Sequence, residues 1–120
     1  MLPELCLTGY SCGDLFGQRT LLNGAVKALG QVCEATAKLG LTALVGTPLE
    51  VNGRLFNVAV AVSRGQILGV VPKTHLPNTG EFYEQRWFAS ARVAPVSEIE
   101  LLGQKVPFGT DLLFQATDMP

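Results

Sequence analysis

The chain has 120 residues, of which 48% are hydrophobic and 16% are charged, and its formal net charge is −1. This length is sufficient for one domain with its own core, and the apolar content excludes a disordered chain. The balanced charge gives no basic patch for nucleic acid. No apolar stretch reaches the roughly 18 residues that a membrane helix requires, and no signal peptide is recognisable. We therefore expect one soluble, cytoplasmic domain that binds neither nucleic acid nor membranes.

The cysteines are three in number, Cys6, Cys12 and Cys33. They form neither an even set nor a metal-ligand spacing, so reduced thiols are the simplest interpretation. Both ends of the chain lie close to apolar segments, and we therefore expect the sequence to be part of a longer protein. The low charge indicates a surface covered by a partner or by further chain, so we also expect either a homo-oligomer or a poorly soluble fragment with an exposed apolar face.

The first segment predicts the end of a buried strand. Residues 2–10 are largely apolar, and Gly9 is placed to close a turn after them. Asp14 follows, and its side chain is suited to cap the turn that begins at Leu15, because an aspartate accepts hydrogen bonds from the free amides of a helix start.

An amphipathic helix is predicted from residue 20, because apolar side chains recur there at steps of three and four residues. Gly40 is expected to end this helix. The apolar face comprises Leu22, Ala25, Val26, Leu29, Val32, Cys33 and Ala37, and the polar face Lys27, Gln31, Glu34 and Lys38.

Three strands are predicted next, at residues 41–49, 56–63 and 66–71. Asn52-Gly53 and Arg64-Gly65 supply the turns between them, and Asn-Gly is the strongest short hairpin signal. A helix followed by such a meander indicates an α/β layer in which at least two strands pair antiparallel. Further along, Trp87 and Phe88 are expected to pack as aromatics. Residues 106–110 predict a strand and turn, and residues 111–116 another strand.

Candidate catalytic groups cluster around the end of the third strand. Lys73 directly follows Pro72, and an ammonium at this position can donate to a developing oxyanion. Glu4 lies in an apolar setting that suits a general base. A solvated lysine and a solvent-facing glutamate are the alternatives that the pattern leaves open.

Two more glutamates follow the lysine. Glu81 and Glu84 lie one turn apart if residues 81–84 are helical, and either could orient Lys73. A solvated first helical turn explains them equally well, since acids are favoured there by the helix dipole.

The remaining reactive side chains have simpler interpretations. His75 is the one histidine and is expected to be a loop or packing residue. Cys33 belongs to the apolar helix face and is expected in the core, while Cys6 and Cys12 lack the strand-to-helix setting of a positioned nucleophile. The residues alone therefore indicate an α/β domain with a possible Glu–Lys site and no nucleophile.

Two separated motifs resemble the nitrilase (carbon–nitrogen hydrolase) superfamily, and the likeness covers essentially all of residues 1–120. Within the superfamily, the Gly-Asp-Leu-Phe form is similar to the glutaminase domains of glutamine-dependent NAD synthetases. The segments that carry the resemblance are PELCLTGY (3–10), CGDLF (12–16), RLFNVA (54–59), VPKTHLPN (71–78), EFYE (81–84) and RWF (86–88).

The resemblance implies part of a nitrilase-type α-β-β-α sandwich with a Glu–Lys–Cys triad. Glu4 would match the general base, Lys73 the oxyanion-stabilising lysine, and Glu84 the auxiliary glutamate beside the triad. The cysteine of the family lies in a third motif, expected beyond residue 120. The reaction implied is thiolate attack on the glutamine side-chain amide, release of ammonia and hydrolysis of the thioester.

The same resemblance implies a partner domain. In the family, ammonia passes to a C-terminal synthetase domain, which uses ATP and Mg²⁺ to amidate deamido-NAD. No cofactor is then expected within residues 1–120.

Three departures from the family pattern leave other functions open. The third motif with its cysteine is expected after residue 120, and the strand and helix that usually precede Pro3-Glu4 are absent from the sequence. Relatives also commonly carry an aromatic where Thr79 stands, at a position associated with holding glutamine. Cys6 and Cys12 do not occupy the nucleophile position. The alternatives are a stand-alone amidase acting on a small amide, and a non-catalytic module of this fold used for subunit contacts.

Overall fold

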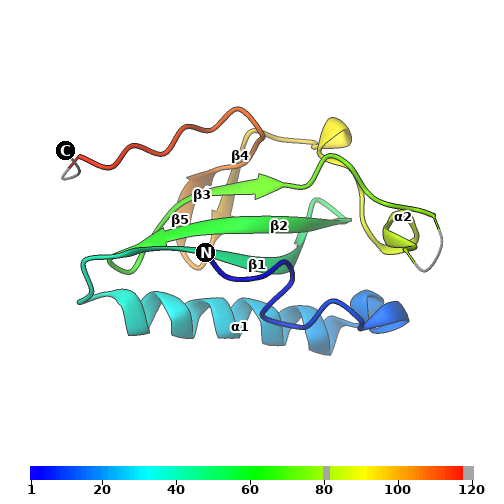
Figure 1. Cartoon of the computed structure of the whole chain (residues 1–120), viewed down its shortest axis with the longest axis horizontal. Coiled ribbons are helices and arrows are strands. Elements are labelled where there is room, and N and C mark those ends of the chain that lie inside the picture. Colours follow the sequence, from blue (N-terminus) through cyan, green and yellow to red (C-terminus); the bar gives the residue numbers. More distant parts are fainter. Residues whose placement is uncertain (80–81, 118–120) are drawn as a thin grey trace.

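A computed structural model describes residues 1–79 and 82–117. Its centre is a three-stranded antiparallel sheet of order β1-β2-β3, and a separate two-stranded hairpin is formed by β4 and β5 (Figure 1). The elements are η1 (Gly13–Gly17), α1 (Arg19–Thr36), β1 (Thr42–Val51), β2 (Arg54–Ser63), β3 (Gln66–Pro72), α2 (Glu84–Trp87), η2 (Ala91–Val93), β4 (Glu98–Leu101) and β5 (Gln104–Pro107).

Two tight turns connect the three strands of the sheet, and the β2–β3 register shifts once between Ala61 and Val62. Asn52 and Gly53 have φ angles of 48° and 78°, and Arg64 and Gly65 have φ angles of 49° and 79°. Both residues of each pair are thus left-handed, as type I′ turns require, and this turn type matches the twist of the strands that it joins. The three predicted strands and both predicted turns are confirmed, with strand ends shifted by one or two residues.

The core lies on one face of the sheet, between the sheet, α1 and the β4–β5 hairpin. Leu29 and Cys33 of α1 pack against this face, and burial raises the pKa of the Cys33 thiol. Phe56 of β2 and Phe108 after β5 meet edge to face, with ring centroids 5.4 Å apart. The predicted amphipathic helix is confirmed in its buried face, although it ends at Thr36 and not at Gly40.

The helix end has a local signature. The Ala37 amide donates to the Glu34 carbonyl at 3.3 Å, three residues back, so the α-helical pattern is not continued, and the Thr36 hydroxyl donates to the carbonyls of Val32 and Cys33 at 2.8 and 3.2 Å. None of the helices in residues 1–79 and 82–117 has the length and apolar character needed to cross a membrane.

The N-terminal segment lies along the outer edge of β1. The Leu2 amide donates to the Leu44 carbonyl at 2.9 Å, and the Leu7 amide donates to the Gly46 carbonyl at 3.2 Å. A Cβ atom on Gly46 would lie 2.5 Å from the Leu5 amide nitrogen and 2.6 Å from the Pro3 carbonyl oxygen. Only glycine therefore allows this close approach, which fixes the part of the chain that carries a candidate site residue.

Two strand predictions are wrong. Residues 4–8 form turns instead of a strand end, because Leu5 is left-handed, at φ 53°, and Gly9 closes the turn on its carbonyl at 2.7 Å. Residues 111–116 are not a strand either, since they find no ladder partner among the described residues. Their side chains instead cover β3, where Leu112 and Phe114 lie against Gly69.

The Gly46 contact generates a test of the fold. Gly46→Ala places a methyl group against backbone atoms, so we expect it to lower the free energy of unfolding by about 1–3 kcal/mol, as overpacking does. Gly24→Ala is the matched control, because a Cβ there meets no atom within 4 Å in the exposed part of α1. It should stabilise by up to about 1 kcal/mol through helix propensity. Denaturant unfolding measures both, and equal effects would contradict the close approach.

Candidate active site

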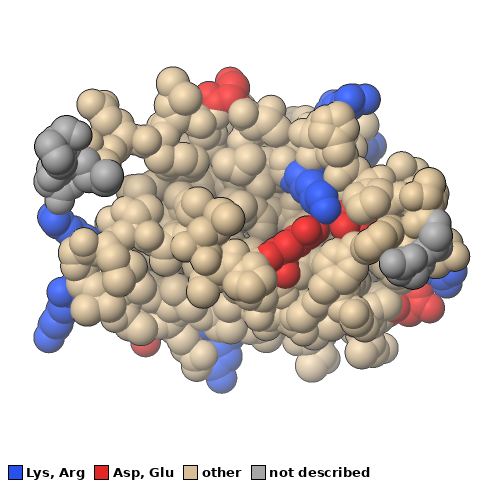
Figure 2. Space-filling view, viewed as in Figure 1, with Lys and Arg blue, Asp and Glu red and all other residues tan. Residues whose placement is uncertain are grey.

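Three segments that are far apart in the sequence meet at one end of the sheet. Glu4 comes from the segment beside β1, Lys73 directly follows β3, and Glu84 is the first residue of α2. The Lys73 Nζ atom lies 2.7 Å from Glu4 Oε1 and 3.0 Å from Glu84 Oε1. In Figure 2, basic and acidic side chains touch near the end of β3, while the surface around them is largely uncharged. The structure thus brings together the three residues that the sequence singled out.

The backbone around Lys73 is held on both sides. Its amide donates to the Asn57 carbonyl at 2.8 Å, which extends the β2–β3 ladder beyond Pro72, and its carbonyl accepts from the Ala91 amide at 3.0 Å. The side chain therefore leaves a rigid strand end. On the opposite side, Glu4 precedes the left-handed Leu5, and this sparsely populated conformation turns the chain immediately after the carboxylate.

The two carboxylates differ strongly in burial. The Glu84 side chain is 3% exposed and that of Glu4 is 43% exposed, with Lys73 at 30%. A buried carboxylate requires a partner, because desolvation of an unpaired charge costs several kcal/mol. Glu84 Oε1 accepts from Lys73 and, at 2.7 Å, from the Tyr10 hydroxyl. Its other oxygen, Oε2, is buried and has no hydrogen-bond partner among the described residues.

The Lys73 ammonium remains charged over a wide pH range. Burial lowers its pKa, but hydrogen bonds and charge interactions with Glu4 and Glu84 outweigh that effect, so the pKa lies above the usual 10.5. The site thus presents a permanent cation at neutral pH.

Two residues of the site were not predicted from the sequence. Asn57 of β2 is buried and donates to Glu4 Oε1 at 2.5 Å, and Tyr10 donates to Glu84. The available signal for Asn57 was an amide within an otherwise apolar strand, opposite the end of β3. For Tyr10 no local signal existed, because its partner lies 74 residues away.

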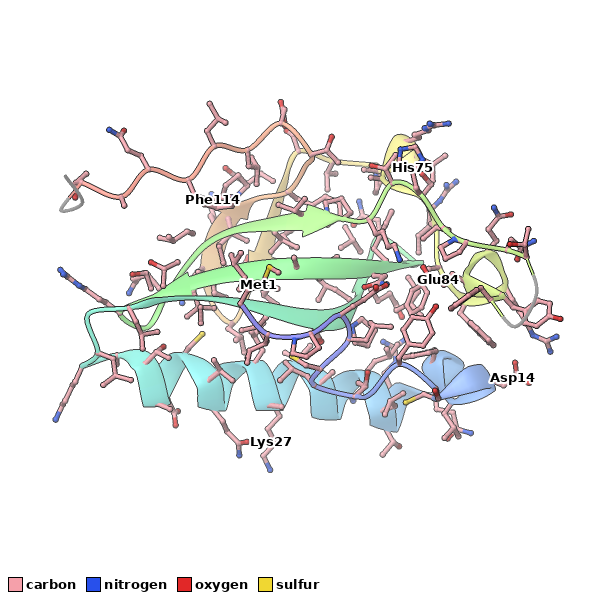
Figure 3. The ribbon with its side chains drawn as sticks, viewed as in Figure 1. Met1, Asp14, Lys27, His75, Glu84 and Phe114 are labelled. Carbon is pink, nitrogen blue, oxygen red and sulfur yellow. The ribbon has the colours of Figure 1, made fainter. Side chains whose placement is uncertain are left out.

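A groove of about 350 Å³ begins at this site and runs over the sheet face opposite to α1. Its polar side chains, Glu4, Asn57 and Lys73, gather at one end, and the rest is lined mainly by apolar residues. Figure 3 shows Met1 lying in front of the sheet, on this face. The remaining lining residues are Met1, Leu2, Pro3, Leu44, Val45, Gly46, Val58, Ala59, Val71 and Pro72.

The sequence predicted that Asp14 caps the turn beginning at Leu15, and this prediction is wrong, because η1 has no side-chain cap. Its carboxylate instead accepts from the Trp87 indole at 3.1 Å and from Arg86 at 3.1 and 3.4 Å. The Trp87 hydrogen bond and the Arg86 charge hold the pKa of Asp14 below its ordinary value. The Phe16 ring packs on Trp87 and Phe88, at centroid distances of 6.0 and 4.9 Å, which confirms the expected aromatic packing.

The other candidates lie elsewhere. His75 is exposed in the loop after Lys73, as expected of a loop residue, and lines a different cavity together with Arg92. Cys6 and Cys12 hydrogen-bond to backbone carbonyls. Glu81 lies outside the described residues.

The helix proposed for residues 81–84 is not formed as expected. Glu84 begins α2, so it is the first residue of the helix and not the last residue of its opening turn.

Comparison with known proteins identifies the family. The carbon–nitrogen hydrolase family model matches residues 1–114. A glutamine-dependent NAD(+) synthetase of Mycobacterium tuberculosis is 43% identical over 120 residues, which is all of this chain and 18% of that protein. The enzyme of the same name from Thermotoga maritima is 39% identical over 88 residues, which is 73% of this chain and 15% of the relative.

Solved structures give the same result. A glutamine-dependent NAD(+) synthetase from Cytophaga hutchinsonii superposes with a TM-score of 0.86 at 32% identity, covering 98% of this chain and 20% of that one. The Acinetobacter baumannii NAD+ synthetase, solved with adenosine diphosphate, gives a TM-score of 0.63 at 29% identity over 87% of this chain and 19% of its own. The chain thus spans about a fifth of the length of these relatives. The family match over residues 1–114, together with this fold, shows that the chain belongs to the carbon–nitrogen hydrolase family.

Proposed function

We propose that this chain supplies the glutamate and lysine residues of a glutamine-hydrolysing site, within a longer NAD synthetase that uses the released ammonia. The observation that carries the proposal is the Lys73 ammonium held between Glu4 and Glu84, at the polar end of a groove. Relatives that are similar over the whole chain bear the name glutamine-dependent NAD(+) synthetase, which supports this substrate and this pathway.

The geometry suits acyl transfer by a thiol. Glu4, half exposed and beside the groove, takes the proton of a cysteine thiol, and the thiolate attacks the side-chain amide carbon of glutamine. The Lys73 ammonium stabilises the oxyanion that develops on the amide oxygen. Glu4 returns the proton to the leaving nitrogen, and ammonia departs. Water activated by Glu4 then hydrolyses the thioester to glutamate and restores the thiol.

The nucleophile of this reaction is assigned to a cysteine outside residues 1–120. Cys6 and Cys12 donate to the carbonyls of Gly46 and Thr8, and Cys33 is buried in the core beneath the sheet. None of the three has a hydrogen bond to Glu4 or Lys73 within the described part of the chain. We therefore assign the attacking sulfur atom to another segment of the complete protein.

ATP and Mg²⁺ are assigned to a separate synthetase domain of the complete protein. Within residues 1–79 and 82–117, no three histidine, cysteine, aspartate or glutamate side chains lie close enough to hold a metal ion. In this proposal residues 1–120 bind glutamine and contact the synthetase domain, within a cytoplasmic homo-oligomer.

Replacing Lys73 tests the proposal. Lys73→Met in the complete protein should lower kcat for glutamine hydrolysis by a factor of about 10² or more, as the loss of an oxyanion donor does. NAD formation from added ammonia should persist, because it bypasses this site. Lys105→Met is the matched control, since Lys105 is exposed on β5. Glutamate release measures the effect, and equal rates for both variants would contradict the assigned role.

The isolated chain should release no ammonia from glutamine, because the attacking thiol is absent. The measurement compares glutamate formation by residues 1–120 with that of the complete protein at equal concentration. Comparable rates would show that one of the three cysteines present is the nucleophile.

The raised pKa of Lys73 predicts that its contribution to the free energy of unfolding decreases at high pH. Its raised pKa means that the folded state holds this proton more tightly than the unfolded state, whose lysine titrates near 10.4. The stabilisation is fully present below about pH 10.4 and is lost as the pH rises through the folded pKa. The advantage of wild type over Lys73→Met in free energy of unfolding should therefore shrink as the pH rises above about 10.4. A constant difference over this range would contradict the ion pairs.

A further inference from the structure

We infer that Asp14 is a positioning residue that holds α2, and with it the Glu84 carboxylate, against Lys73. The inference rests on the proposed function, because its main readout is glutamine hydrolysis. Asp14 touches neither Glu4 nor Lys73 through any hydrogen bond or ion pair of the described residues, so its effect is transmitted through α2.

Helix α2 is too short to define its own position. It has four residues, Glu84–Trp87, and a single turn gains little from its own hydrogen bonds. The chain before it, residues 73–79 and 82–83, contains no helix or strand. The placement of Glu84 must therefore come from contacts that α2 makes with other elements.

The loop before α2 supplies two of those contacts, since the Glu84 amide donates to the Pro77 carbonyl at 3.1 Å and the Gln85 side chain to the Leu76 carbonyl at 3.3 Å. Besides the ion pair with Lys73, the contacts made through side chains at both ends of α2 come from the N-terminal part of the chain. Asp14 accepts three hydrogen bonds from α2, one from the Trp87 indole and two from the Arg86 guanidinium. Four residues earlier, Tyr10 donates to Glu84 itself. The same short segment thus binds α2 at both of its ends, since Glu84 is the first and Trp87 the last residue. Figure 3 shows Asp14 and Glu84 at the same end of the molecule.

The Asp14 contacts are poorly placed to contribute to global stability. The Asp14 side chain is 76% exposed and that of Arg86 is 67% exposed, and exposed ion pairs contribute little to folding. The aromatic packing of Phe16 with Trp87 and Phe88 would keep α2 attached without them. What the directional hydrogen bonds add is the orientation of the turn about its own axis, and this orientation sets where Glu84 points.

Orientation matters here because the Glu84 to Lys73 distance is only 3.0 Å. A misplacement of about 1 Å in a catalytic constellation can cost about 10²-fold in rate. Lys73 would then be held by Glu4 alone, and its ammonium would no longer be fixed from two sides.

The test uses the complete protein with Asp14→Ala, and Glu50→Gln as matched control. The control removes another ion pair, Arg19–Glu50 at 3.0 Å, whose residues lie outside α2. Because Glu50 lines the same cavity as Asp14, Arg86 and Trp87, this variant also controls for the loss of a negative charge near α2. We expect Asp14→Ala to lower kcat for glutamine hydrolysis about tenfold with little change in KM or in melting temperature, and Glu50→Gln to leave kcat unchanged. Asp14→Asn, which keeps an acceptor for the indole, should lie between wild type and Asp14→Ala. An unchanged kcat in both Asp14 variants would overturn the inference.

A double-mutant cycle separates a positioning role from a general structural one. If Asp14 acts through Glu84, Asp14→Ala should cost little further activity in a Glu84→Gln background. Costs that multiply would show that the two residues act independently, and the inference would be wrong.

An activity-independent measurement covers the case in which the proposed function fails. If wild type releases no glutamate from glutamine, the proposed function is wrong, and competitive acylation of lysines decides the inference alone. Displacing Glu84 removes a group that raises the pKa of Lys73, so Lys73 should react several-fold faster, relative to Lys105, in Asp14→Ala than in wild type. An unchanged ratio would overturn the inference even in an inactive protein.

Discussion

A buried carboxylate that must be neutralised is the constraint on which the site depends. Glu84 is almost fully withdrawn from water, and an unpaired charge at that depth would destabilise the fold by several kcal/mol. The Lys73 ammonium meets this requirement at 3.0 Å, and the Tyr10 hydroxyl adds a neutral donor to the same oxygen. Because the same ammonium also pairs with Glu4, the N-terminal segment is held beside Lys73 as well.

The scaffold supplies the precision that these short distances demand. The end of β3 is fixed by its pairing with β2, whose register starts at the Arg64-Gly65 turn and shifts by one residue between Ala61 and Val62, so Lys73 leaves the sheet at a defined place. The segment carrying Glu4 is fixed by its close approach to Gly46, where no side chain fits. The sheet therefore fixes the positions of two of the three charged groups, Lys73 and Glu4. Only Glu84 lies on an element with little structure of its own.

The sequence predicts those parts of the fold whose signals are local. Apolar runs, two turn dipeptides and a helical repeat are each contained within a short stretch of sequence, and the corresponding elements are confirmed. Residues 111–116 show the limit of this reasoning: they have the composition of a strand, but a strand also needs a ladder partner, and composition does not supply one. Residues 2–10 fail for a different reason, since the left-handed Leu5 has no sequence signal.

The site was predicted only in part, and mainly from the resemblance. Pattern alone left a solvated alternative for Glu4, Lys73 and Glu84, because a single charged residue at a strand end or helix start has the same sequence signature whether or not it has a partner. Asp14 was misassigned for the same reason. An aspartate that caps the next turn and one that binds Arg86 and Trp87, more than 70 positions further along, look the same in the sequence.

The different burial of the two glutamates assigns them different tasks in the proposed reaction. A group that accepts a thiol proton and returns it to a leaving nitrogen must face the bound molecule, and Glu4, 43% exposed and lining the groove, satisfies this condition. Glu84, 3% exposed and absent from the groove lining, does not reach that space. Its fixed negative charge instead acts on Lys73, whose pKa it raises and whose ammonium it holds in place. Exchanging the two environments would leave the charges unchanged but would place the proton acceptor where no substrate can meet it.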